Sequence, residues 1–369
     1  MEKDLKIIVM ENAKELGNKI NEHLKKLNGD KNYILNVSSS RFSNGEGKVR
    51  LEDSVRDKDI YILSDVGNYS ISYEMHGRTH YMSPDEHFQD IKRVISATSG
   101  HAGNINLVMP LLYQARQHKR KGSESLDCAI ALQELEKLGV KEIVTFDAHD
   151  PNVSNAIPNL PFDNFYPTHE ILNTLLEKDS ECLKNIMVVS PDMGAMERAR
   201  YYAEMLNSDV GVFYKRRDLS KVINGKNPIV EHVYMGSDVK DKNIIVVDDM
   251  IATGSSMIDV AAELKTRGAN KVYLVATFAL LTEGTNKFNK AFVNGYFDKL
   301  YSTNLSYVPK EFKNETWYEE VDCSYYVAEI IHSLHRRESL KPLHHSKEKL
   351  LKRIKEVIYE KSTNINTSS

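Results

Sequence analysis

The sequence predicts an α/β protein made of two doubly wound domains with mainly parallel sheets. Short runs of apolar, β-branched residues recur along the chain without polar alternation, as expected for strands buried on both faces of a parallel sheet. Many of the stretches between these runs carry apolar residues at helical spacing. The length of 369 residues exceeds one typical core and fits two domains plus an extension.

The first series of elements predicts an N-terminal domain over residues 1–158. The helical pattern over residues 13–27 places Leu16, Ile20 and Leu24 on one face, and a second helix is expected near 126–138. The predicted strands of this domain cover residues 5–10, 33–37, 60–63, 105–109 and 142–146. The segment 151–167 is dense in Pro and Asn, which favours a crossing between domains.

A second series predicts a C-terminal domain over residues 159–320. Its expected helices cover residues 170–176, 194–206 and a stretch that begins after 256, and its expected strands cover residues 186–189, 210–214, 229–234, 243–247, 271–279 and 299–301. The two halves suggest a duplicated architecture, although no sequence repeat is visible. A helix at 325–337, within the segment 321–342, is expected to pack back on the N-terminal domain.

Residues 343–369 are expected to form a basic helical tail. Five apolar residues fall on one face of this helix: Leu350, Leu351, Ile354, Val357 and Ile358. This favours a docking or oligomer helix. A nucleic-acid or membrane patch is the alternative, but the acidic residues Glu348, Glu356 and Glu360 interrupt the positive charge.

Composition limits the partners and the compartment. A net charge of −3 gives no general attraction to nucleic acid or membrane, so neither is expected as a partner. The three cysteines are far apart, odd in number and not in metal-ligand spacing, which favours reduced thiols. The N-terminus lacks the apolar core of a signal peptide, and no run of about 18 apolar residues occurs. We therefore expect a cytoplasmic protein.

The stretch NIIVVDDMIATGSS, residues 243–256, carries the clearest chemical signal. Asp248 and Asp249 stand at the carboxyl end of a predicted strand, and small residues lead from there into a helix. Unpaired N–H groups at a helix N-terminus and nearby hydroxyls favour a phosphate, whereas the carboxylates suit vicinal sugar hydroxyls or Mg²⁺. The alternative is an ordinary turn in which Ser255 caps the helix and the aspartates are solvated.

VVDDMIATGSS resembles the phosphoribosyl-diphosphate loop shared by type I phosphoribosyltransferases and ribose-phosphate diphosphokinases. The resemblance implies domains of the type I phosphoribosyltransferase kind. It also implies that ribose 5-phosphate is bound by Asp248, Asp249, Thr253, Gly254, Ser255 and Ser256. The loop alone does not separate the enzymes that make phosphoribosyl diphosphate from those that use it.

Two stretches of the N-terminal half resemble the ATP-binding loops of the diphosphokinases. RFSNGE implies that Phe42 stacks on adenine and that Asn44 and Glu46 accept hydrogen bonds from its amino group; Asn44 stands where the family commonly has Asp. ARQHKRK follows a predicted strand and implies contacts from Arg116, Gln117 and Lys119 to the phosphates and ribose of ATP. Taken alone, these residues also fit a core anchor and a solvated basic face.

FDAH and SPDMG resemble the stretches that supply the family's two protein ligands of the ATP-bound Mg²⁺, here His149 and Asp192. Imidazole is a poor Mg²⁺ ligand on hardness grounds, so the role of His149 rests on resemblance. Asp192 also fits a plain helix N-cap. YKRR, followed by the polar stretch 218–228, resembles the family's mobile catalytic loop. This implies that Lys215 and Arg217 neutralise charge in the transition state; a surface patch is the alternative.

The order of these motifs identifies the chain as a divergent member of the ribose-phosphate diphosphokinase family. The implied reaction transfers the diphosphoryl group of ATP to the 1-hydroxyl of ribose 5-phosphate with Mg²⁺, in a homo-oligomer built from dimers. Three departures stand out: Gly122–Leu126, Ala252 and the enlarged segment 68–87. The first two leave a non-catalytic regulatory paralogue as an alternative, and the third is expected to reshape an oligomer contact. A type I phosphoribosyltransferase is a third possibility, but it needs a nucleobase pocket that the sequence does not show.

Overall fold

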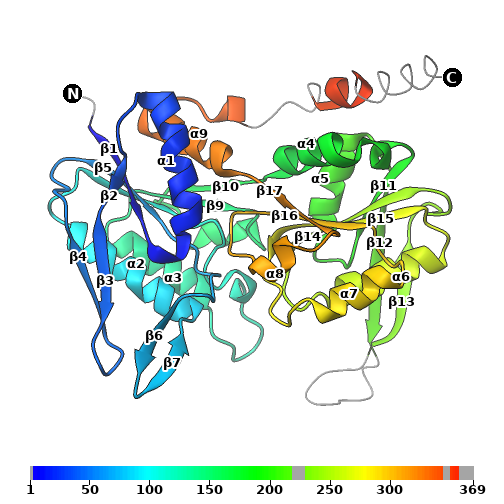
Figure 1. Ribbon diagram of the computed structural model, residues 1–369, viewed down its shortest axis with the longest axis horizontal. Helices are drawn as coiled ribbons and strands as arrows, with labels where there is room; N and C mark the ends of the chain where they lie inside the picture. The colour runs from blue at the N-terminus through cyan, green and yellow to red at the C-terminus, as the bar shows by residue number, and fades with distance from the viewer. Residues whose placement is uncertain (1–2, 218–228, 344–349, 357–369) are drawn as a thin grey trace. The chain divides into compact units, whose positions relative to one another are not determined.

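The computed structural model describes residues 3–217, 229–343 and 350–356, and for 215–217 and 229–232 it describes the backbone alone (Figure 1). The chain forms two compact units. Unit 1 comprises Met1–Pro167, Asn304–Val308 and Asp322–His344, and unit 2 comprises Thr168–Thr303, Pro309–Val321 and His345–Ser369. None of the helices formed by the described residues has the length and apolar content needed to span a bilayer.

Unit 1 is built on a six-stranded sheet in which all neighbouring strands are parallel. In spatial order its strands are β10 (Phe162–Phe165), β9 (Glu142–Phe146), β8 (Asn104–Val108), β5 (Asp59–Leu63), β1 (Leu5–Val9) and β2 (Ile34–Leu35). All five residues of β5 are buried, as a strand covered on both faces requires. The predicted parallel sheet is confirmed for this unit.

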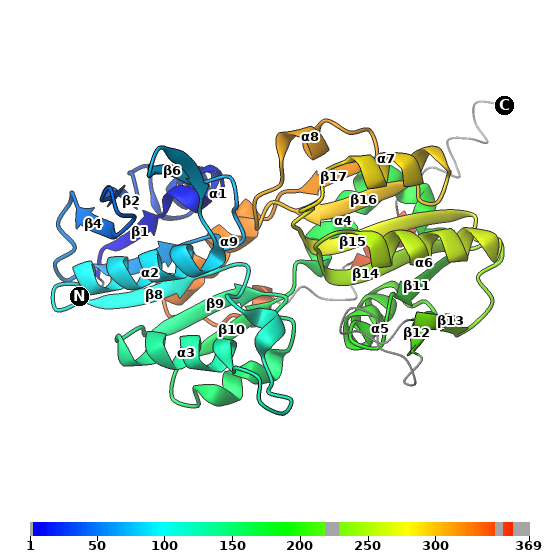
Figure 2. The same cartoon turned by 90° about the horizontal axis from the view of Figure 1, so that it is seen from below.

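The helices of unit 1 lie on both faces of its sheet (Figures 1 and 2). They are α1 (Lys14–Asn28) and α9 (Ser324–His335), which pack together, and on the other face α2 (Pro84–Thr98) and α3 (Asp127–Lys137). The chain leaves β1 through α1 toward β2 and leaves β5 through α2 toward β8, so the strand order reverses between β1 and β5. Such a point is where α/β sheets usually bind ligands.

Two hairpins and three short 3₁₀ helices complete the larger part of unit 1. They are β3 (Val37–Arg41) with β4 (Gly47–Leu51), β6 (Ser72–Met75) with β7 (Arg78–Tyr81), η1 (Glu11–Ala13), η2 (Ala115–Gln117) and η3 (Pro151–Ala156). The enlarged segment 68–87 therefore folds as the β6–β7 hairpin and the first turn of α2. The sequence did not predict either hairpin, because two-stranded ribbons with exposed faces lack the buried apolar run of a sheet strand.

Unit 2 is built on a seven-stranded sheet that is parallel except for its last pair, β12 and β13. In spatial order the strands are β13 (Ile229–Met235), β12 (Val210–Arg217), β11 (Ile186–Ser190), β14 (Asn243–Ile251), β15 (Lys271–Ala279), β16 (Lys299–Thr303) and β17 (Tyr318–Val321). This confirms the predicted mainly parallel sheet.

Helices also cover both faces of the sheet in unit 2 (Figure 1). One face carries α4 (Thr168–Asp179) and α5 (Met196–Leu206), and the other carries α6 (Ser255–Thr266) and α7 (Asn286–Val293). The short elements are η4 (Ser180–Leu183) and α8 (Lys310–Lys313), with η5 (Lys341–Leu343) in unit 1. The chain leaves β11 through α5 toward β12 and leaves β14 through α6 toward β15, so the strand order reverses between β11 and β14.

The units divide after Pro167, later than the boundary at residue 158 predicted from the sequence. The reason is β10, which lies within the segment 151–167 that we expected to be a crossing. Backbone pairing of β10 with β9, from Phe162 opposite Ile143 to Phe165 opposite Phe146, makes it the edge strand of unit 1. Four residues with few apolar neighbours in sequence carry too little periodicity to be recognised as a strand.

The first part of the basic tail, residues 350–356, is helical and packs within unit 2. Leu350 and Ile354 are buried, at 1% and 8% exposure. The Arg353 guanidinium donates to Asn173 Oδ1 at 2.7 Å and to Glu177 Oε1 at 2.6 Å, both on α4. These contacts support a docking role for this turn; Val357 and Ile358 lie outside the described residues.

A buried carboxylate ties the returning segment Asn304–Val308 to the end of β5 in unit 1. Asp65 is 3% exposed and accepts hydrogen bonds from Gly67 N at 2.9 Å, Ser306 Oγ at 2.9 Å and Tyr307 N at 2.7 Å. Burial raises the pKa of Asp65 to about 6, against the three hydrogen bonds, which lower it. The folded chain therefore binds this proton more tightly than the unfolded chain does.

Asp65→Asn is expected to lower the free energy of unfolding by about 1–3 kcal/mol at neutral pH, because the amide turns a donor toward a buried N–H. Since the folded pKa is raised, the stabilisation from protonation is full below about pH 4 and lost as pH rises through about 6. The difference in the free energy of unfolding between wild type and variant should thus widen by about 1 kcal/mol from pH 7 to pH 5. Thermal unfolding at the two pH values measures it, with exposed Asp57→Asn as the control. A constant gap would contradict the assignment.

Candidate active site

The acidic pair of unit 2 lies inside β14, where the strand order reverses. The strand was predicted to end at Val247, with Asp248 and Asp249 beyond it, but it continues to Ile251. The long neighbour β15 supplies the pairing, Asp248 opposite Ala276 and Ile251 opposite Ala279, whereas pairing with β11 ends at Val246 opposite Val189. The pair is therefore held by backbone hydrogen bonds on one side and faces the end of β11 on the other.

The acidic pair is not solvated, which contradicts the alternative of an ordinary turn. Asp249 is 3% exposed, and the Asp248 side chain is only 24% exposed. Burial first, and then the charge of Asp249, raises the pKa of Asp248 well above its ordinary value. The guanidinium of Arg198, on α5, lies 3.9 Å from Asp248 Oδ1 and opposes this shift. Negative charge gathered in this way favours a cation or hydroxyl donors as a ligand.

The small-residue loop after β14 is a short turn that leads from Ile251 into α6. Gly254 stands at the N-cap of α6 with φ of +80° and has no side chain that could cap the helix. Ser255 is the first residue of α6, which contradicts the alternative in which it caps the helix in an ordinary turn. Its Oγ accepts a hydrogen bond from Lys287 Nζ at 2.7 Å. The start of α6 thus lies beside a lysine, and positive charge at a helix N-terminus favours an anion.

A cluster of aromatic side chains packs against this loop and holds it in place. A Cβ at Gly254 would lie 2.2 Å from Phe288 Cζ, so only glycine fits there. Phe288 stacks on Trp317 with ring centroids 5.4 Å apart and contacts Phe297 and Phe312 edge-on. The loop therefore rests on a well-packed core that holds its backbone in place.

Asp192 lies at the carboxyl end of β11, where the strand order reverses. Its Oδ1 accepts hydrogen bonds from Gly194 N at 2.8 Å and Ala195 N at 3.2 Å, at the start of α5. Asp192 thus orders the turn before α5; the N-cap of the helix is Ala195, so the alternative of a plain N-cap is wrong. Asp192 also lies near enough to Asp248 for its charge to raise the pKa of that carboxyl. The structure thus brings Asp192 and the acidic pair to one sheet edge.

Lys215 and Arg217 end the next strand along that edge. The backbone of β12 extends to Arg217 and pairs with β13, Lys215 opposite His232 and Arg217 opposite Ile229. The strand is longer than the predicted 210–214. The side chains of both residues, and the predicted loop 218–228, lie outside the described residues. Because β12 is parallel to β11, its end shares the edge that carries Asp192 and the acidic pair.

The turn 42–46 joins β3 to β4 in unit 1 and carries the three residues expected to bind adenine. Phe42 is 55% exposed, which a core anchor would not be. The Asn44 side chain organises the turn: its Nδ2 donates to Glu46 Oε2 at 2.8 Å, and its Oδ1 accepts from Glu46 N at 3.2 Å. A Cβ at Gly45 would lie 2.7 Å from Met75 Sδ, so the β6–β7 hairpin packs against this turn.

Arg116 and Gln117 lie in η2, and Lys119 follows it. The predicted position directly after a strand is wrong, because six residues, 109–114, separate β8 from η2. Gln117 Nε2 donates to Ser125 O at 2.8 Å and to Lys119 O at 3.3 Å. The segment Gly122–Leu126, which departs from the family pattern, is therefore folded onto the loop that is expected to contact ATP.

His149 follows β9 and lies beside that same loop. Its ring centroid is 5.3 Å from that of His118, a residue the sequence reasoning did not single out. His118 Nε2 lies 3.3 Å from Asp150 Oδ2, and Nδ1 lies 3.2 Å from Ala115 O, which fixes the ring between η2 and β9. The structure thus gathers Arg116, Gln117, Lys119 and His149 at the carboxyl ends of β8 and β9.

The residues of unit 2 fit a hard cation. Asp192, Asp248 and Asp249 supply carboxylate oxygens, the ligand type that Mg²⁺ prefers, and their mutual repulsion would be relieved by a metal ion. His149 offers only nitrogen, which suits Mg²⁺ poorly. Among the described residues no group of three or more His, Cys, Asp or Glu side chains has the geometry of a complete metal site. Substrate oxygens would therefore have to complete the coordination.

Sequence reasoning missed Arg198 and Lys287, the two basic residues that contact this site in unit 2. Arg198 follows the start of a predicted helix, but its direction toward Asp248 depends on how α5 packs. Lys287 begins α7, which was not predicted at all. Neither residue belongs to a motif with a chemical meaning of its own, so only the fold reveals them.

Both units contain a mainly parallel sheet, and the candidate site residues lie near the carboxyl ends of its strands. The chain is therefore an α/β protein with a type I phosphoribosyltransferase-like fold. The crystal structure of phosphoribosylpyrophosphate synthetase from Mycobacterium smegmatis has the same fold. It aligns with a TM-score of 0.74 at 22% identity, covering 91% of this chain and 100% of that chain.

Sequence comparison gives the family. Residues 5–139 match the N-terminal domain of ribose phosphate pyrophosphokinase, and residues 163–294 match the phosphoribosyl transferase domain. The ribose-phosphate pyrophosphokinase of Haemophilus influenzae is 30% identical over 287 residues, 77% of this chain and 82% of that protein. That of Haemophilus ducreyi is 29% identical over 342 residues, 91% of this chain and 98% of that protein. The chain therefore belongs to the ribose-phosphate pyrophosphokinase, or diphosphokinase, family, as its motifs indicated.

Gly254→Ala is expected to destabilise unit 2 more than an ordinary glycine replacement, because the new methyl group would clash with Phe288. Gly295→Ala is the matched control: its φ is +70°, close to the +80° of Gly254, but a Cβ there meets open space. The control carries only backbone strain, about 1–2 kcal/mol, and Gly254→Ala should cost about 1–3 kcal/mol more. Chemical unfolding of both variants measures the difference, and equal losses would show that Phe288 does not confine the loop.

Proposed function

We propose that the chain is a catalytically active ribose-phosphate diphosphokinase. It transfers the diphosphoryl group of ATP to ribose 5-phosphate, giving 5-phosphoribosyl 1-diphosphate and AMP. The observation that carries the proposal is the pair Asp248 and Asp249, the second of them buried, beside a helix whose N-cap is Gly254, in a chain whose residues 5–139 match the N-terminal domain of the pyrophosphokinases. Proteins similar over most of the chain are named for this activity.

Ribose 5-phosphate binds at the end of β14. The carboxylates of Asp248 and Asp249 accept from the ribose hydroxyls, and residues Thr253–Ser256 hold the 5-phosphate with backbone N–H and hydroxyl groups. Lys287, which donates to Ser255, adds positive charge beside the phosphate. The raised pKa of Asp248 fits this role, because hydroxyl donors stabilise the charged form that burial disfavours.

ATP is held by residues of unit 1. Phe42 stacks on adenine, Asn44 and Glu46 contact its amino group, and the phosphates and ribose meet three residues of the η2 loop, Arg116, Gln117 and Lys119. Exposure of Phe42 supports the stacking role. Mg²⁺ held by His149 and Asp192 would neutralise phosphate charge when bound. The family likeness also leads us to propose a homo-oligomer built from dimers.

In the reaction the 1-hydroxyl oxygen of ribose 5-phosphate attacks the β-phosphorus of ATP. The bond from that phosphorus to the bridging oxygen of the α-phosphate breaks, AMP leaves, and the hydroxyl proton passes to solvent. Lys215 and Arg217 neutralise the charge that develops during this transfer, in which positioning and electrostatics dominate over covalent chemistry. No protein base is assigned.

The purified chain alone, with ATP, ribose 5-phosphate and Mg²⁺, is expected to form AMP, and omission of ribose 5-phosphate is expected to abolish it. A coupled AMP assay measures this. No AMP from a folded chain, together with altered activity of an added diphosphokinase, would instead support the regulatory paralogue that Ala252 and Gly122–Leu126 suggest. Release of pyrophosphate from supplied phosphoribosyl diphosphate and a nucleobase would support a phosphoribosyltransferase.

Lys215→Ala is expected to lower kcat about a hundredfold or more with little change in KM, because its contact is made mainly in the transition state. The matched control is Lys184→Ala, at the opposite end of the same sheet, before β11. Lys184 pairs with the exposed Glu181 at 2.8 Å, an interaction of little energetic value. Steady-state AMP formation measures both variants. Near-normal turnover of Lys215→Ala would refute the role.

A further inference from the structure

Unit 1 contains a cavity of about 450 Å³ whose described lining includes none of the residues expected to hold the substrates. It lies beside the carboxyl end of β1, between the β3–β4 hairpin, the β6–β7 hairpin and α2. Its apolar lining includes Val9, Val37, Val49, Ile71 and Val94. Of the residues expected to hold ATP, none is among the described residues that line it. Its volume falls in the range of small-molecule sites.

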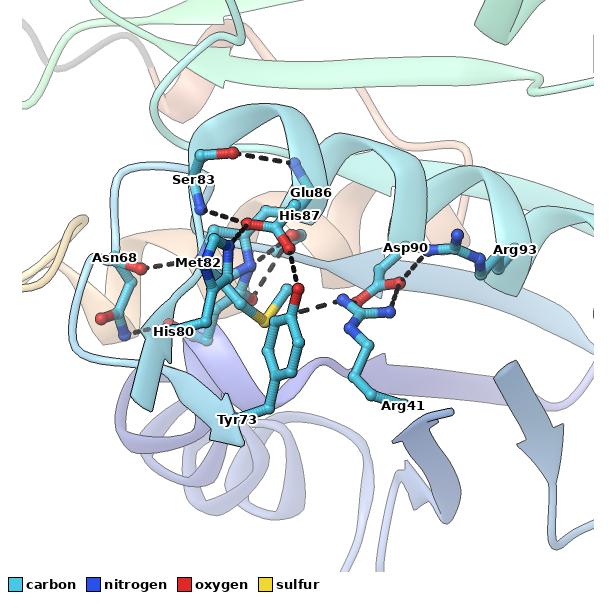
Figure 3. A network of polar contacts seen from close by, with 12 residues as sticks. Arg41, Asn68, Tyr73, His80, Met82, Ser83, Glu86, His87, Asp90 and Arg93 are labelled. Carbon is cyan, nitrogen blue, oxygen red and sulfur yellow. Dashed lines mark hydrogen bonds and ion pairs between the residues drawn. The ribbon is translucent and has the colours of Figure 1, made fainter. Parts of the chain in front are cut away.

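Hydrogen bonds between neighbouring elements fix the walls of this cavity (Figure 3). Asp90, on α2, accepts from both terminal nitrogens of Arg41 at 2.8 and 2.6 Å and from Arg93 at 2.6 Å. Glu86 accepts from Tyr73 Oη at 2.8 Å and contacts His80 Nε2 at 3.2 Å. These bonds tie both hairpins to α2, so a ligand would find the site already formed and lose less entropy on binding.

The charge of the cavity disfavours anions. Arg41 is the one permanently cationic side chain among the described residues that line it, and its guanidinium is engaged by Asp90. Carboxylates of Glu11 and Glu74 also line the cavity. A carboxylate or phosphate ligand would thus meet negative charge without a free positive partner.

A buried histidine supplies one directed polar group. His87 lines the cavity at 2% exposure, and its Nε2 donates to Asn68 O at 2.7 Å. Burial lowers the pKa of His87, so the ring is neutral, and the bond to Asn68 makes Nδ1 the unprotonated nitrogen. Nδ1 is thus the acceptor nitrogen of a residue that lines the cavity. It is therefore an acceptor that a ligand N–H can satisfy.

We propose that this cavity binds a small, non-anionic molecule with an apolar body and an N–H donor that reaches His87 Nδ1. The site is separate from the proposed ATP and ribose 5-phosphate sites and does not depend on the proposed activity. Its outer wall is the β6–β7 hairpin, which is part of the segment 68–87 that enlarges this chain.

The test uses a matched series of probes: benzamide, benzamidinium and benzoate, which differ in charge but hardly in size, and methyl benzoate, which lacks the N–H donor. Binding to the full chain is followed by saturation-transfer NMR titration. Ser39→Trp blocks the cavity from an exposed position on β3, whereas Ser38→Trp on the opposite face of the same strand is the matched control. Binding to the cavity is the part of the NMR signal that Ser39→Trp removes.

We expect benzamide and benzamidinium to bind with Kd of about 1 mM, Ser39→Trp to weaken both at least about tenfold, and Ser38→Trp to leave them unchanged. Benzoate should not bind in the cavity, so Ser39→Trp should leave its binding signal unchanged. Methyl benzoate should bind several-fold more weakly than benzamide, and His87→Leu should remove that preference. Failure of benzamide to bind, equal loss in the two tryptophan variants, or binding of benzoate as tight as that of benzamide would each overturn the proposal.

Discussion

Two adjacent carboxylates at the end of a buried strand are the constraint on which the candidate site depends. Asp248 and Asp249 belong to β14, whose pairing with β15 continues past the last residue paired with β11. Because one sheet neighbour ends early, the carboxylates face a point where the strand order reverses, with Asp192 close by. Arg198, at 3.9 Å, opposes only part of the rise in the pKa of Asp248, so a cation or hydroxyl donors would favour the charged form of the pair.

The two units share one topology but use the reversal of strand order differently. In unit 1 this point is filled by hydrogen-bonded side chains: Asn12 Nδ2 donates to Ser64 Oγ at 3.1 Å, and Asn68 Nδ2 donates to Asn12 O at 2.8 Å. Asp65, beside them, accepts hydrogen bonds from the returning segment Asn304–Val308. The position proposed to hold a ligand in unit 2 is thus structural in unit 1, and the cavity of unit 1 lies to the side, under its two hairpins.

The sequence predicted the sheets well because many of their strands are buried and mostly apolar, as β5 and β15 are after their first residues. It also predicted the acidic pair and the glycine turn, because these residues have a chemical meaning at a strand end. It missed the hairpin carrying Phe42, whose strand β3 is largely exposed and rich in serine. It missed Lys287 and His118 as well, since their contacts arise from packing between elements distant in sequence.

The departures from the family pattern leave the backbone of the expected loops in place. Ala252 contributes its carbonyl oxygen, which accepts from Thr282 N at 2.9 Å and Thr282 Oγ1 at 3.3 Å, and such bonds do not depend on the side chain. In the same way Ser125 holds Gln117 through its carbonyl oxygen. A residue change at these positions therefore removes side-chain contacts to a substrate without dismantling the loop. Weaker substrate binding, rather than loss of the site, is the consequence that this geometry favours.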